Sequence, residues 1–154
     1  MTLSTKQKIQ LAFWLIVVLS LTYIRENLAI EINAIIDGYD YNRAGFYWFQ
    51  RWLGTLDFRQ LTMVKWGLVG VFYPVFTLLA ILIIHHSFHQ KNYTHTTLYF
   101  YSIILLVLIL VTAVAYPLGY FDAVYFFLRK LLGFVFSPLP VFMLWLAFYS
   151  FSRD

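Results

Sequence analysis

Four long apolar stretches, separated by polar segments, run along this chain of 154 residues. A helix needs about 20 predominantly apolar residues to cross the hydrocarbon core of a bilayer. The pattern therefore predicts an all-α membrane protein, a single polytopic domain over residues 1–154 with four transmembrane helices in an antiparallel bundle. The expected spans cover residues 9–25, 64–84, 98–118 and 131–151, and an interfacial, aromatic-rich cap of loop and helix covers 25–63.

The fourth stretch is the least regular of the four. Arg129 and Lys130 divide it, so residues 121–128 are expected to lie in the membrane interface and only the part after the two cations to cross. Within that part, Ser137-Pro138-Leu139-Pro140 removes two backbone donors and disfavours helical geometry before each proline. We expect a kink or two half-helices there, facing protein because lipid cannot satisfy the freed carbonyls.

The amino-acid composition supports a membrane location and excludes every site that depends on cysteine. Hydrophobic residues make up 62% of the chain and charged residues 12%, against about 25% charged in ordinary soluble domains. The lipid bilayer is therefore the first partner expected. The chain has no cysteine, which excludes disulfides, thiolate metal sites and thiol nucleophiles.

The cap is electrically balanced, so the net charge of +4 does not form a nucleic-acid patch and no nucleic-acid partner is expected. Aromatic residues between 46 and 52 suit the depth of lipid headgroups. Membrane orientation stays open. The cap side has seven basic residues and the other side four, so the positive-inside rule favours external termini. Lys6 and Lys8 favour the opposite orientation, because they flank the first helix, which often decides the orientation of the whole chain.

The segment from Arg25 to Gly38 has a helical pattern, with Gly38 as a suitable C-terminal stop. Its polar residues form a strip along the helix, which is either a solvated interfacial face or a contact surface for a partner or substrate. Together with the proline segment, the candidate contact residues are Arg25, Glu26, Asn27, Glu31, Asn33, Asp37, Ser137, Pro138 and Pro140.

Four histidines, His85, His86, His89 and His95, follow the second apolar stretch. His85 and His89 have the i, i+4 spacing at which two imidazoles on a helix can meet one transition metal. A b-type haem would need two imidazoles on opposite faces, which His86 and His95 could supply from two helices. No Asp or Glu occurs between residues 58 and 121 to orient them, so solvated interfacial histidines are the alternative without a cofactor.

No catalytic residue is assigned, because the chain lacks a Gly-x-Ser-x-Gly elbow, a Ser-x-x-Lys pair and a phosphate-binding glycine loop. The sequence favours a non-catalytic accessory or assembly subunit of a larger membrane complex. The alternatives are a metal- or haem-dependent redox subunit that uses the histidines, and a membrane enzyme or carrier for a lipid-linked substrate.

The strings Arg25-Glu26-Asn27-Leu28 and Glu31-Ile32-Asn33, together with the Ser137–Pro140 segment, resemble features of small accessory membrane proteins associated with bacterial exosortase systems. The resemblance covers about thirty residues in patches and the four-span plan. It implies envelope polysaccharide export or protein sorting in a bacterial cytoplasmic membrane, with a larger integral membrane protein as partner. It supplies no catalytic residues, since exosortases use a membrane-embedded cysteine that this chain lacks.

Overall fold

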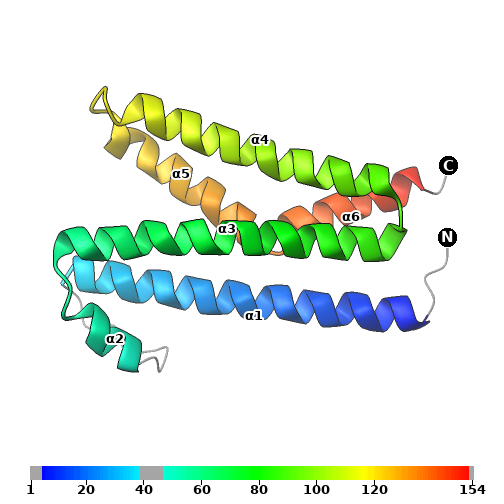
Figure 1. The fold of residues 1–154 in the computed structure, drawn as a ribbon, viewed down its shortest axis with the longest axis horizontal. Helices are drawn as coiled ribbons and strands as arrows, with labels where there is room; N and C mark the ends of the chain where they lie inside the picture. The colour runs from blue at the N-terminus through cyan, green and yellow to red at the C-terminus, as the bar shows by residue number, and fades with distance from the viewer. Residues whose placement is uncertain (1–4, 39–46, 153–154) are drawn as a thin grey trace.

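The computed structural model describes residues 5–38 and 47–152, without the side chains of Lys6, Gln7, Tyr47, Trp48 and Asp122. Every element in this part of the chain is an α-helix, as the apolar pattern predicted. The helices are α1 (Thr5–Ile36), α2 (Tyr47–Leu53), α3 (Phe58–Phe88), α4 (Lys91–Ala115), α5 (Phe121–Val135) and α6 (Leu139–Phe151). Helix α3 is central and contacts α1, α4 and α6 (Figure 1).

Three of the helices are long and apolar enough to cross a membrane, namely α1 from Lys8 onward, α3 and α4. Helices α5 and α6 form a fourth candidate span together, although their axes are bent by 57°. The chain therefore has three to four candidate spans, as expected of an integral membrane protein. The start of α1, the α3–α4 junction and the end of α6 lie at one end of the molecule (Figure 1).

Helix α1 continues well past the expected end of the first span at residue 25. It stops at Ile36, and Gly38 then takes a positive φ of 73° while its N–H bonds back to the Ile35 carbonyl. The predicted glycine stop is confirmed, because glycine adopts this left-handed backbone without steric cost. Residues 25–36 of the expected cap are thus part of α1, and residues 39–46 lie outside the described residues.

A capping box fixes the start of α3. The Asp57 carboxylate accepts a bond from the Gln60 N–H (2.7 Å), and the Gln60 side chain accepts one from the Asp57 N–H (3.0 Å). Each bond satisfies a donor that the helix itself cannot pair. Of the expected cap, α2 is the helix that packs on the bundle, with Leu53 fully buried against Ile32 and Leu61.

The expected division of the fourth stretch at Arg129 and Lys130, into an interfacial part and a crossing part, stays a prediction. Helix α5 runs without interruption through both residues to Val135. Two adjacent cations do not break an α-helix, because arginine and lysine are good helix formers. The helix ends where backbone donors are missing, and α6 begins at Leu139 between the two prolines, so the predicted kink is confirmed.

The carbonyls freed by the prolines find partners within the chain. Pro138 cannot donate to the Phe134 carbonyl, which instead accepts from the Ser137 hydroxyl (2.7 Å). Pro140 cannot donate to the Phe136 carbonyl, which lies 2.8 Å from the Thr22 hydroxyl of α1. That hydroxyl shares its single proton with the Val18 carbonyl, also at 2.8 Å. Pro140 is buried and Pro138 half-buried. The freed carbonyls thus have partners within the protein, as expected from the cost of unpaired carbonyls in lipid, whereas Leu139 between the two prolines is 54% exposed.

The topology can be tested directly because the native chain has no cysteine. We expect single cysteines at Gln90 and Ser152 to react with a membrane-impermeant maleimide from one side of sealed vesicles, and a cysteine at Thr55 to react from the other. Gln90 and Thr55 are exposed at opposite ends of α3. Reaction of Gln90 and Ser152 from opposite sides would contradict the four-span antiparallel bundle, and the accessible side also gives the orientation.

Candidate functional site

The polar strip of α1 does not face a single environment. Arg25, Glu26 and Asn33 line a cavity, whereas Asp37 is exposed beyond the end of the helix. Asn27 and Glu31 are buried with 8% and 2% of their surfaces exposed, and the Glu31 Oε2 atom has no hydrogen-bond partner. The Asn27 side chain donates to the Tyr23 carbonyl of its own helix (2.7 Å). The solvated-face interpretation is therefore wrong for Asn27 and Glu31.

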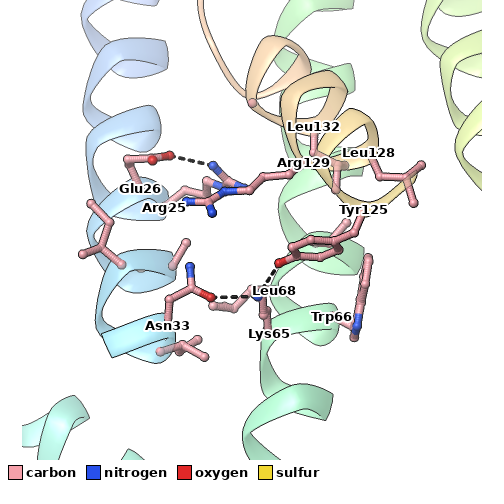
Figure 2. A pocket seen from close by; sticks show the side chains of 15 residues that line it. Arg25, Glu26, Asn33, Lys65, Trp66, Leu68, Tyr125, Leu128, Arg129 and Leu132 are labelled. Atoms are coloured by element: carbon pink, nitrogen blue, oxygen red, sulfur yellow. Dashed lines mark hydrogen bonds and ion pairs between the residues drawn. The ribbon is translucent and has the colours of Figure 1, made fainter. Parts of the chain in front are cut away.

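The cavity has a volume of about 120 Å³ and lies among α1, α3 and α5. We call it the basic pocket. Its polar side chains come from all three helices and converge on the same space (Figure 2). They are Arg25, Glu26 and Asn33 from α1, Lys65 and Trp66 from α3, and Tyr125 and Arg129 from α5.

Lys65 ties the three helices together. Its half-buried ammonium donates to Asn33 Oδ1 of α1 (2.7 Å) and to the Tyr125 hydroxyl oxygen of α5 (2.7 Å), as Figure 2 shows. An ammonium group has three N–H donors, and two are used by these neutral acceptors. Among the described residues no carboxylate pairs with Lys65, and one of its donors is left for a further partner.

Arg25 is held on two sides. Its guanidinium pairs with Glu26 Oε2 (2.7 Å) and lies over the Phe136 ring, 4.6 Å from the centroid. Such cation–π contacts strengthen as the cation loses water, and the Arg25 side chain is 16% exposed. This pair of contacts anchors the middle of α1 to the start of the α5–α6 break.

Arg129 extends from α5 toward Arg25, and their guanidinium groups lie next to each other (Figure 2). Among the described residues, Arg25 and Glu26 form an ion pair, and no carboxylate pairs with Arg129 or Lys65. Three cations and one carboxylate thus line the basic pocket, which gives it a formal charge of +2. A concave site of one sign attracts counter-charge, and guanidinium groups suit the geometry of phosphate and carboxylate.

The cations differ in depth, because Asn33, the α1 partner of Lys65, is eight residues past Arg25 and therefore about 12 Å away along the helix. Arg25 follows the charge-free stretch of α1 that begins at Ile9, and Lys65 precedes the charge-free stretch of α3 that ends at Ile84. At 1.5 Å per residue these stretches are about 24 and 28 Å long, close to the roughly 30 Å of a hydrocarbon core. Lys65 thus lies at the end of the charge-free stretch of α3, and Arg25 lies against Phe136, nearer the middle of the helices.

Sequence reasoning missed Lys65, Tyr125 and Arg129 as site residues. A signal was present, because Arg25, Lys65 and Arg129 each stand at the boundary of an apolar stretch on the same side of the expected bundle. The sequence pattern used Arg129 only as a boundary within the fourth apolar stretch. The proline segment, by contrast, is absent from the lining of the pocket, although Phe136 beside it supports Arg25.

Three of the four histidines lie together at the opposite end of α3. The ring centroids of His89 lie 6.4 Å from His85 and 5.7 Å from His86, while His95 stands exposed on α4. His85 contacts the Thr94 hydroxyl (3.2 Å), His86 contacts the Gln10 side chain, and His89 caps α3 with a φ of 54°. Among the described residues, no group of three or more potential ligands has a metal-binding arrangement.

Comparisons of the chain with models of protein families, with curated proteins and with solved structures found no match. The basic pocket is therefore interpreted from its own geometry and charge.

Proposed function

We propose that this protein is an integral membrane protein that binds an anionic headgroup in the basic pocket. The observation that carries the proposal is the convergence of Arg25, Lys65 and Arg129 from three separate helices on one cavity that contains a single carboxylate. Charges placed among apolar helices are costly and are usually retained for a function. The role is that of a carrier or presenting subunit for a lipid-linked anion.

The internal contacts support binding of an anion over a purely structural role. A structural site would pair each cation with a carboxylate, but the Lys65 acceptors are the neutral Asn33 and Tyr125 oxygens. The Arg129 guanidinium lies beside another cation. A bound phosphate would relieve this repulsion and accept hydrogen bonds from Lys65 and Arg129 at once.

Phosphate titration of the purified protein tests the proposal. We expect inorganic phosphate to raise the unfolding temperature of the detergent-solubilised protein in a saturable manner, because a ligand that binds the folded state stabilises it by mass action. Choline chloride at the same ionic strength is the control for general salt effects. Equal shifts with both salts, or no shift with phosphate, would contradict the proposed site.

A second candidate function follows from the exposed rim of the pocket. The Glu26 side chain is 55% exposed and Arg129 is exposed, so both could pair with charged residues of another membrane protein. This geometry is compatible with an accessory subunit of a larger complex. The resemblance to exosortase-associated proteins implies the same role, in the assembly of a bacterial envelope.

The subunit role predicts that Glu26→Ala and Asn33→Ala reduce co-purification of a partner in mild detergent by several fold, while membrane insertion is unchanged. Asn33→Ala acts indirectly, because it frees the Lys65 ammonium that Asn33 holds at the rim. Asn92→Ala is the matched control, since Asn92 is exposed at the opposite end of the molecule. Unchanged yields of the complex in both pocket variants would contradict the second candidate.

A further inference from the structure

A second cavity adjoins the basic pocket. It is a groove of about 640 Å³ between α3, α4 and α5, within the size range of about 300–1,000 Å³ that is usual for ligand sites. We call it the apolar groove. Four side chains line both cavities and form the wall that they share, namely Trp66, Val69, Leu128 and Leu132.

The lining of the apolar groove differs from that of the pocket in having no charged residue. Gly70, Pro74, Leu105, Ile109 and Ala113 are among its members. The absence of a side chain at Gly70 contributes to its width, because a Cβ built on that residue would meet no atom within 4 Å. The groove is thus suited to hydrocarbon.

The two cavities lie on either side of the shared wall, the charged one toward α1 and the apolar one toward α4. The groove begins at Trp66, next to Lys65, and extends along α3 to Pro74, about 12 Å deeper into the charge-free stretch. A ligand with its anion on Lys65 would therefore have its chain beside the groove. The groove then offers the chain a continuous apolar surface toward the middle of the bilayer.

We infer that the two cavities together bind one amphiphile, a lipid phosphate monoester, with its phosphate in the basic pocket and one hydrocarbon chain in the apolar groove. This inference rests on the proposed function and names the class of ligand. A phosphate monoester carries a charge of about −1.5 to −2 at neutral pH, which matches the formal +2 of the pocket. A zwitterionic phosphodiester carries one negative charge and would add a cation beside Arg25 and Arg129.

Native mass spectrometry in a non-ionic detergent tests the inference with two probes, dodecyl phosphate and butyl phosphate. We expect the protein to bind dodecyl phosphate at least tenfold more tightly than butyl phosphate. Gly70→Leu should fill the groove and reduce this ratio to about threefold or less, with butyl phosphate binding unchanged. Gly67→Leu is the matched control, because Gly67 is an exposed α3 glycine with the same open space around it and lines neither cavity.

The probe partitions into detergent micelles equally for both glycine variants, so the comparison between them removes this effect. If Gly70→Leu fails to fold, Ala113→Leu fills the same groove from α4. Equal chain-length ratios in the groove variant and in Gly67→Leu would overturn the inference, as would equal binding of dodecyltrimethylammonium. In either case, retained binding of butyl phosphate would still support the proposed headgroup site. If the native protein bound neither dodecyl phosphate nor butyl phosphate, the proposed function itself would be contradicted.

Discussion

Replacing Arg129 with glutamine is expected to weaken phosphate binding about tenfold or more without destabilising the protein in the absence of ligand. The guanidinium has no carboxylate partner among the described residues and lies beside that of Arg25. Its hydrogen bonds to a bound anion would contribute about 1.5–3 kcal/mol, which corresponds to roughly a 10- to 150-fold change in affinity. Removing it from the empty site relieves repulsion and breaks no ion pair.

Lys130→Gln is the matched control for this prediction. Lys130 is the neighbouring cation on α5, is exposed, lies over the Phe126 ring (4.3 Å to the centroid) and does not line the pocket. Both variants lower the net charge by one, so a general electrostatic effect would change phosphate affinity equally in the two. Equal losses would contradict a defined site, as would a loss of thermal stability in ligand-free Arg129→Gln that exceeds the loss in Lys130→Gln.

Phe136→Ala is expected to cause the largest loss of stability, about 3–5 kcal/mol, which is the usual range for removing a buried phenylalanine. The side chain is 1% exposed at the break between α5 and α6. Its ring meets Phe76 at 5.5 Å and Tyr73 at 6.4 Å between centroids, and it also lies under the Arg25 guanidinium. Its removal leaves a cavity and takes away the aromatic face that holds a half-buried cation.

Thermal unfolding in detergent, followed by circular dichroism, would measure the effect. Phe127→Ala is the matched control, because Phe127 is on α5 and 52% exposed, and surface substitutions usually change stability by about 0.5 kcal/mol or less. A similar loss in both variants would show that Phe136 is not part of a packed core. Phe136→Leu should recover part of the stability, since leucine refills much of the cavity but provides no aromatic face for Arg25.

The sequence by itself determined the helical class, the candidate spans and two features of the backbone. Candidate spans can be predicted from a sequence because each helix must by itself match the thickness of the hydrocarbon core. Whether it does depends only on the residues of that stretch. The stop at Gly38 and the break at Pro138 and Pro140 are equally local, since each depends on the backbone freedom or the missing donor of a single residue. Arg129 and Lys130 divide the apolar stretch but not the helix, since α5 continues through both of them.

Only the tertiary structure decided which polar groups meet. Arg25, Lys65 and Arg129 are far apart in the chain, and their convergence depends on how α1, α3 and α5 are rotated about their axes by packing around residues such as Leu128 and Phe136. The sequence also could not indicate that the Thr22 hydroxyl of α1 would lie within hydrogen-bond distance of the Phe136 carbonyl. The physical reason is that hydrophobic matching fixes the depth of a helix, whereas its rotation is set by side-chain contacts with helices distant in sequence.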